Sequence, residues 1–152
     1  MTPDPDLVFR LANGLALLCW LALVISPPSA GWTRRVWWVC GRMVPLVLSA
    51  GYLLMFALYW RGEGGFGSPA EVRALFDVPG VLVAGWMHYL AFDLFVGVWI
   101  ASRGAQTGLP HVAVVPLLLL TFMLGPVGLL SFLVIRSLRR SEAPDEFPGA
   151  TV

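Results

Sequence analysis

The stretch WMHYLAFDLFVGVWIAS, residues 86–102, decides the fold because it is long, apolar and interrupted by ionisable side chains. Those side chains are His88 and Asp93, with Tyr89 between them. An ionisable group at mid-bilayer costs roughly 3 kcal/mol or more, so it is rare and usually faces protein or trapped water. Such a residue indicates a functional site by default.

The composition of the whole chain indicates an integral membrane protein. Hydrophobic residues make up 58% of the 152 residues and charged residues only 12%, with a mean hydropathy of +0.78. A soluble domain carries roughly 25% charged residues, so the charged surface of a water-soluble globule is missing. A net charge of +1 without any lysine argues against a nucleic-acid partner.

Four apolar runs can each supply the ~20 residues that cross a bilayer. Only helices satisfy every backbone polar group in lipid over runs of this length. The runs lie at residues 7–25, 43–60, 78–102 and 112–135. The predicted fold is therefore an all-α, four-transmembrane-helix bundle over residues 1–140, followed by a polar, disordered tail at 141–152.

The first run resembles a signal peptide only weakly. A small-residue stretch at 28–31 could be a cleavage site, but Asp4, Asp6 and Arg10 stand where a signal peptide has a basic start. We favour a retained helix. Cys19 and Cys40 have no metal-binding or redox spacing and are predicted to be free, packed thiols.

Two connecting segments have the chemistry of the membrane interface. GWTRRVWWVCGR at 31–42 is aromatic and basic, which favours an interfacial anchor, or alternatively a site for anionic lipid or substrate. SPAE at 68–71 fits a capping box with proline at the first helical position. We therefore predict a short interfacial helix over 68–76, between the second and third spans.

The arginines indicate an orientation only weakly. In a bundle of four spans, the N-terminus, the second loop and the tail share one side with six arginines, against four on the other. This count favours both termini in the cytoplasm of a bacterial inner membrane.

The third helix can present its ionisable groups on two different faces. At 100° per residue, Tyr89 and Asp93 share a face with Trp86, while His88 lies about 140° away from Asp93. One narrow cleft therefore cannot hold both groups unless it wraps around the helix or the helix kinks. A carboxyl group among apolar atoms favours its neutral form, which can donate a proton. Alternatively, Asp93 only ties two helices together.

The fourth helix has a stripe of small residues, Thr121, Gly125 and Gly128, which lets another helix or a flat ligand approach closely. Pro126 is predicted to kink this helix near Phe122. We favour close packing as the purpose of the stripe over a cavity beside the third helix. His111, at the start of the fourth helix, is expected to be a solvated loop residue.

Four segments together resemble a known family: GFGS at 65–68, GWMHYLAFDLFVG at 85–97, GLPH at 108–111 and LTFMLGPVGLL at 120–130. They are similar to the abscisic-acid-deficient-four-like family of small membrane proteins. Plant members of that family are implicated in neoxanthin synthesis, the conversion of the epoxy-carotenoid violaxanthin to an allenic carotenoid. The resemblance covers roughly residues 43–136 and implies a redox-neutral isomerisation that needs no cofactor.

If the resemblance extends to the reaction, a neutral Asp93 is the acid that opens the epoxide, and His88 or Tyr89 handles the second proton. The residues expected to bind the carotenoid or isoprenoid substrate are Trp86, Phe92, Phe95, Trp99 and Thr121. No metal-binding or cofactor-binding motif is present in the sequence. The alternatives are a non-catalytic protein that binds carotenoid or lipid or assists assembly of a membrane complex, and, less favoured, a small-solute transporter.

Overall fold

The computed structural model describes residues 2–139, and every regular element within them is a helix. They are α1 (Pro5–Val24), α2 (Thr33–Trp38), the π-helix η1 (Val39–Met43), α3 (Val44–Tyr59), α4 (Pro69–Phe76), α5 (Pro79–Gln106) and α6 (His111–Leu138). By residue count and composition, four helical stretches in this part of the chain could cross a membrane: α1, the continuous α2–η1–α3, α5 and α6. The predicted all-α membrane class is confirmed. The tail expected at 141–152 lies outside the described residues.

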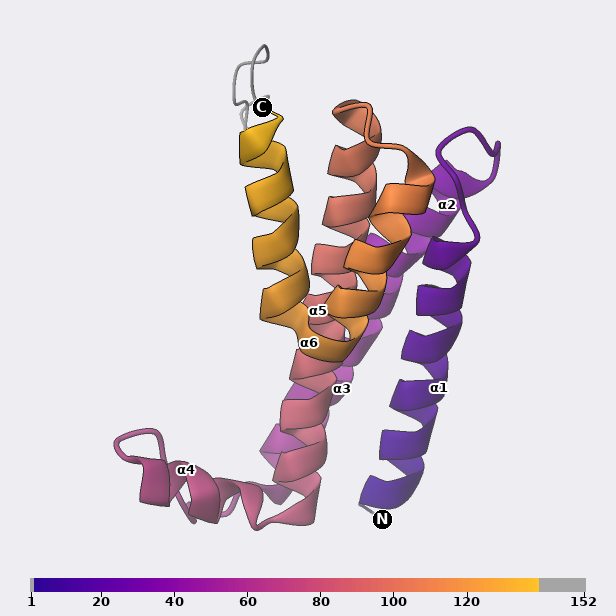
Figure 1. The fold of residues 1–152 in the computed structure, drawn as a ribbon. Coiled ribbons are helices and arrows are strands. Elements are labelled where there is room, and N and C mark those ends of the chain that lie inside the picture. Colours follow the sequence, from indigo (N-terminus) through magenta and orange to yellow (C-terminus); the bar gives the residue numbers. More distant parts are fainter. Residues whose placement is uncertain (1, 140–152) are drawn as a thin grey trace, which may run out of the picture.

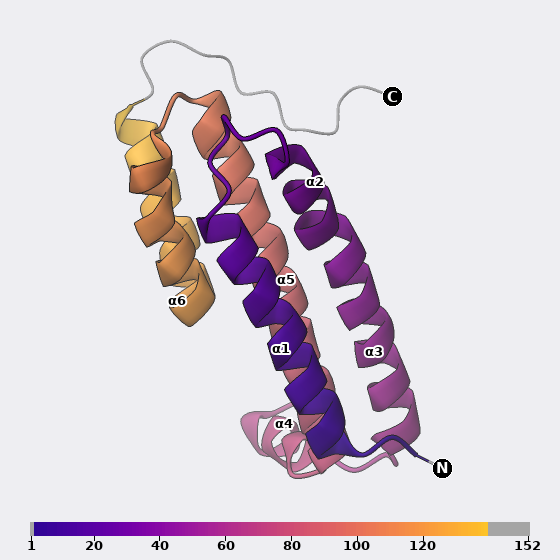
Figure 2. The same ribbon diagram turned by 90° about the vertical axis from the view of Figure 1, so that its right-hand side faces the viewer.

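The central helix is α5, and the other long helices surround it (Figures 1 and 2). It contacts α1, α3, α4 and α6. In its most apolar window 44% of the residues are buried inside the protein, against 28% in each of the other three spans. Gly80 and Gly97 of α5 lie so close to the rings of Tyr59 and Trp20 that a side chain would collide with them. The segment that decides the fold therefore lies at the centre of the bundle.

The second span begins earlier than the sequence pattern predicts, at Thr33 instead of about residue 43. The aromatic, basic segment is thus helical from Thr33 and continuous with α3. Its turns widen at η1, where the N–H of Val44 donates to the carbonyl of Val39. Pro45 follows directly; it has no N–H, and its ring crowds the carbonyl of Gly41, so a wider turn is favoured there.

The short helix α4 confirms the predicted helix at residues 68–76 and its cap at Ser68. Ser68 Oγ accepts a hydrogen bond from the N–H of Glu71 at 3.3 Å, and the Glu71 carboxylate accepts one from the N–H of Gly67 at 3.0 Å. Leu75 is buried, and Arg73 is exposed. In Figure 1, α4 lies across the same end of the bundle as the start of α1.

The fourth long helix folds back on itself. Leu124 has φ −146° and ψ 65°, far from helical values, and the two arms of α6 run side by side to the same end of the bundle (Figures 1 and 2). A Cβ placed on Gly128 would be 2.4 Å from the backbone nitrogen of Thr121, whereas seven residues of straight helix span about 10 Å. Pro126 does break the helix, as predicted, but the break is a reversal beside Leu124.

This reversal separates the two ends of the described chain. Pro5 begins α1 at the α4 end of the bundle, and Leu138 finishes α6 at the opposite end (Figure 1). The prediction that both termini share one side of the membrane does not follow from this arrangement. That expectation required α6 to cross the membrane completely, whereas each arm is only about 20 Å long against a hydrocarbon core of roughly 30 Å.

Candidate functional site

The candidate site lies where the reversal of α6 meets α5. A Cβ on Gly125 would be 2.1 Å from Oδ1 of Asp93 and 2.8 Å from its Cγ, so the carboxyl group lies directly against the glycine backbone. Gly125 is buried, and its lack of a side chain is what makes room for the carboxyl. Asp93 as a whole is half-buried, and its Oδ2 is buried against α6.

The carboxyl group is enclosed but incompletely hydrogen-bonded. Asp93 Oδ2 is buried and has no hydrogen-bond partner. The Tyr89 side chain, one helical turn before it, interacts with the Asp93 carboxyl and with the backbone of Gly125. A buried polar atom without a partner costs about 1–3 kcal/mol, and such atoms in a folded protein require an explanation. Asp93 therefore retains an oxygen that can receive or carry a proton.

Trp86 extends the same face of α5 toward α1. Its ring stacks on Tyr89 with centroids 5.3 Å apart, and its Nε1 donates to Oδ1 of Asn13 at 3.0 Å. Phe9 of α1 also packs against Trp86, at 5.6 Å between centroids. This hydrogen bond joins α5 directly to α1.

Thr121 lies where the two arms of α6 pack against each other. It is fully buried, and its hydroxyl donates to the carbonyl of Leu117 at 2.7 Å. Gly128 on the second arm packs against Thr121. The small residues thus allow the two arms of α6 to pack closely together and allow Gly125 to contact α5. This arrangement agrees with the prediction that the stripe serves close packing.

His88 lies on a different side of α5 from Asp93, as the helical geometry predicts. Its ring is exposed, stacks on Phe92 at 4.5 Å and is 5.7 Å from the ring of Tyr52 in α3. The structure therefore brings Asp93 and Tyr89 together and does not bring His88 to them.

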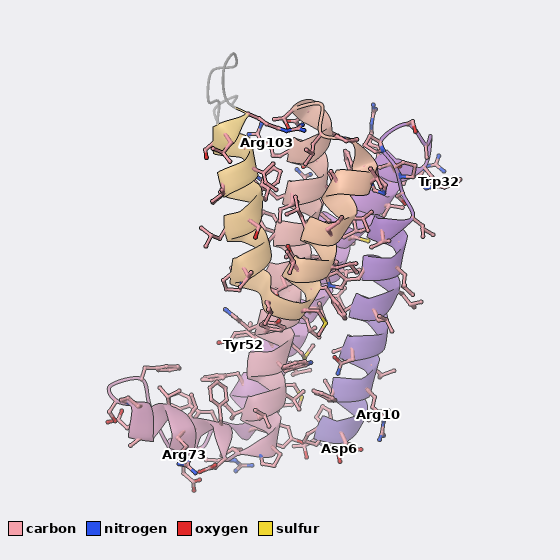
Figure 3. The ribbon with its side chains drawn as sticks, in the orientation of Figure 1. Asp6, Arg10, Trp32, Tyr52, Arg73 and Arg103 are labelled. Carbon is pink, nitrogen blue, oxygen red and sulfur yellow. The ribbon has the colours of Figure 1, made fainter. Side chains whose placement is uncertain are left out.

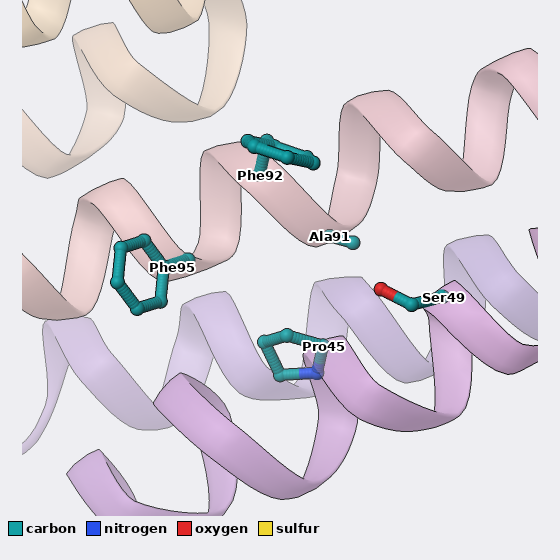
Figure 4. Close-up of a pocket in the computed structure, with 5 residues that line it drawn as sticks. All are labelled: Pro45, Ser49, Ala91, Phe92 and Phe95. Carbon is teal, nitrogen blue, oxygen red and sulfur yellow. The ribbon is translucent and has the colours of Figure 1, made fainter.

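The four aromatic residues expected to bind substrate face three different helices that pack against α5. Trp86 faces α1. Phe92 and Phe95 line a cavity of about 270 Å³ between α3 and α5, together with Ala91 and two residues of α3 (Figure 4). Trp99 packs edge-on against Phe132 of α6, at 5.3 Å and 81°. A single groove lined by all four is not formed.

Other polar groups have structural partners. Nε2 of His111 lies 2.8 Å from the carbonyl oxygen of Val24, so His111 joins the start of α6 to the end of α1 and is not a solvated loop residue. Cys19 and Cys40 are buried and free, as predicted. Among residues 2–139, no group of three or more His, Cys, Asp or Glu side chains gathers closely enough to hold a metal ion.

Comparison with known proteins assigns the family. No match is found among curated proteins or among solved structures. The family described as ABA DEFICIENT 4-like matches residues 7–132, which include most of α1, the α2–α3 span, α4, α5 and most of α6. The match covers more than half of the chain and contains both Asp93 and the reversal of α6. The chain therefore belongs to the ABA4-like family.

Proposed function

We propose that the protein is a redox-neutral isomerase of an epoxy-carotenoid or a related isoprenoid dissolved in the bilayer, with Asp93 as its proton donor. The observation that carries this proposal is the enclosed Asp93 carboxyl, whose Oδ2 has no hydrogen-bond partner. Membership of the ABA4-like family supports a neoxanthin-synthase-like reaction.

A lipid-soluble substrate can approach this site from within the membrane. Because the arms of α6 end near mid-depth, the surface of α5 beyond the reversal is not covered by α6 (Figure 1). Apolar side chains there are open to the surroundings: Trp86 is 37% exposed, Phe9 39% and Leu124 56%. Tyr89 and Asp93 lie at the inner end of this surface, so a long apolar molecule can approach them without passing through water.

The proposed reaction balances without an oxidant or a cofactor. The Asp93 carboxyl donates its proton to the epoxide oxygen, and the carbon–oxygen bond breaks with its electron pair going to oxygen. The positive charge left on carbon is delocalised along the polyene, where the faces of Trp86 and Tyr89 can stabilise it. A neighbouring carbon then loses a proton to the Asp93 carboxylate, and the electrons of that carbon–hydrogen bond form the new double bond of the allene.

The position of His88 favours one carboxyl for both proton transfers. His88 faces α3, so a substrate beside Asp93 does not reach it. Tyr89, which interacts with the Asp93 carboxyl, is better placed to orient the substrate or to stabilise the carboxylate between the two steps. We therefore assign the second transfer to Asp93 itself, with Tyr89 as its positioning residue.

The alternative is a non-catalytic protein that binds carotenoid or lipid, in which Asp93 only ties α5 to α6. The close Asp93–Gly125 contact is also what such a tie would make. Co-expression of the chain with an epoxy-carotenoid pathway distinguishes the two functions. An isomerase yields a new pigment of unchanged mass, whereas a binding protein yields bound but unaltered pigment.

The fold-back of α6 also suggests an orientation. Arginines near the ends of helices gather at the end opposite α4: Arg34, Arg35, Arg103, Arg136 and Arg139. Figure 3 shows Arg103 and Trp32 at that end, with Arg10, Asp6 and Arg73 at the other. The positive-inside rule therefore favours the end with α2 in the cytoplasm and α4 on the opposite side.

Labelling with a membrane-impermeant maleimide tests this orientation. In cells expressing the chain, Ala74→Cys in α4 should react without lysis, and Ser137→Cys near the end of α6 only after lysis. Four complete spans would put both positions on one side, so identical labelling of the two variants would overturn the proposed orientation.

A further inference from the structure

A groove between α3 and α5 is formed by two adjoining cavities. They have volumes of about 270 and 500 Å³ and share three lining residues, Pro45, Ser49 and Phe95. Figure 4 shows the Ser49 side chain and the ring of Phe95 on facing helices beside the smaller cavity. Because Asp93 faces α6, this groove is separate from the site proposed for catalysis.

One end of the groove is basic. Arg42 and Trp38 line the larger cavity, and the side chains of both are exposed. Within residues 2–139, no hydrogen bond or ion pair joins the Arg42 guanidinium to another side chain. Arg42 belongs to η1, whose widened turn lies directly before Pro45. A guanidinium without a protein partner, on a stem long enough to reach the interface, is suited to a phosphate group.

The rest of the groove is apolar. The smaller cavity is lined by Ala91, Phe92 and Phe95 of α5, and Phe92 stacks on His88. Ser49 lies seven residues after Arg42, about 10 Å along a helix. The groove is therefore charged near Arg42 and aromatic near Phe92 and Phe95. An amphiphile has the same order of chemistry, from a charged headgroup to an apolar chain.

We propose that this groove binds an anionic phospholipid, with its phosphate at Arg42 and an acyl chain along Ser49 and Phe95. Charge complementarity decides the occupant. Arg42 lies toward the arginine-rich end of the bundle, where an anionic leaflet attracts basic side chains. A zwitterionic lipid has a cationic group next to its phosphate, which Arg42 repels. This inference does not depend on the proposed enzymatic activity.

Native mass spectrometry of the full-length protein tests the proposal. Phosphatidylglycerol and phosphatidylcholine are added separately to the detergent-solubilised protein. One phosphatidylglycerol should remain bound per chain, in preference to phosphatidylcholine. Arg42→Ala should weaken phosphatidylglycerol binding about fivefold, the effect of one basic residue at an anionic membrane surface, and Arg42→Lys should retain most of it.

A second pair of variants tests the apolar part of the groove. Ser49→Trp fills both cavities without changing charge and should abolish retention of the lipid. Leu53→Trp, at an exposed position of α3 outside the cavities, is the matched control and should leave binding unchanged. Equal binding of the two lipids, or binding unaffected by both Arg42→Ala and Ser49→Trp, would overturn the proposal. Displacement of phosphatidylglycerol by soluble glycerol phosphate would do so too, because the site would then recognise a free anion.

Discussion

On the side of α5 that meets α6, the carboxyl of Asp93 lies against the backbone of Gly125, whereas on the side that meets α3 the ring of His88 is exposed and stacks on Phe92. The first side is closed by a glycine and holds a buried oxygen without a partner. The second opens into cavities. Enclosure favours proton transfer, because it removes water that competes for the carboxyl, while an open apolar groove is suited to holding a chain.

The largest effect should come from Asp93→Asn. The amide keeps the size of the carboxyl and can still hydrogen-bond, but it cannot donate a proton and regain it. If the closed side of α5 is catalytic, isomerisation should fall by the ~10²–10⁴ typical of general acid catalysis while the protein still inserts and folds. The measurement is pigment conversion in membranes, normalised to folded protein.

The control for this variant is Asp77→Asn, the same substitution at the exposed end of α4. It should leave conversion unchanged, because Asp77 lies outside the proposed site. If the Asp93→Asn protein converts pigment as fast as this control, Asp93 is not the proton donor, and its role is to hold α5 and α6 together.

The next largest effect should come from Gly125→Ala. Its methyl group would be 2.1 Å from Oδ1 of Asp93, so the carboxyl or the reversal of α6 must move. Overpacking of this kind costs roughly 1–3 kcal/mol. Gly125 has no positive φ, so alanine is acceptable to the backbone and the cost comes from the contact. Unfolding by a denaturing detergent measures the loss of stability.

A double-mutant cycle isolates that contact. In an Asp93→Ala background the carboxyl is absent, so Gly125→Ala should cost much less than in the natural sequence. Coupling of about 1 kcal/mol or more is expected for residues in contact. If the costs of the two substitutions simply add, the closed side of α5 is not held together by this contact.

The sequence predicted much of this arrangement and failed at the reversal of α6. The apolar runs predicted the helices, and helical periodicity placed Asp93 and His88 on separate faces. The most apolar 18-residue window of α6 has a mean hydropathy of 2.4, so hydropathy alone cannot distinguish a complete span from two half-length arms. Pro126 indicated a break in the helix, but the angle of the break depends on the packing of Gly128 against Thr121. The bond between Trp86 and Asn13 joins residues 73 positions apart, and no local pattern indicates it.

A smaller effect is expected for Trp86→Phe, which keeps an aromatic ring on Tyr89 but removes the donor to Asn13. Asn13 Oδ1 would then lose its hydrogen-bond donor, while α1 would remain packed against α5. The cost should be about 1 kcal/mol, the net contribution of one hydrogen bond. Trp38→Phe, at an exposed tryptophan of α2, is the control in the same unfolding experiment. Equal stability of the two variants would mean that the Trp86–Asn13 bond does not hold the closed side to α1.

The smallest effect should come from His88→Gln, and it gives the sharpest comparison of the two sides. His88 is exposed and faces α3, so glutamine should change conversion by about twofold or less, the ~0.5 kcal/mol range of ordinary surface substitutions. Tyr89→Phe, one residue along the same helix, removes the hydroxyl beside Asp93 and should slow conversion by about tenfold or more, since a hydrogen bond to an ionised group contributes roughly 1.5–3 kcal/mol. Both variants are compared in one pigment assay with equal amounts of folded protein. The reverse result, slow conversion by His88→Gln and fast conversion by Tyr89→Phe, would place the reaction on the α3 side of α5. Only a substrate lying along Phe92 would contact the imidazole of His88 without contacting the phenol of Tyr89.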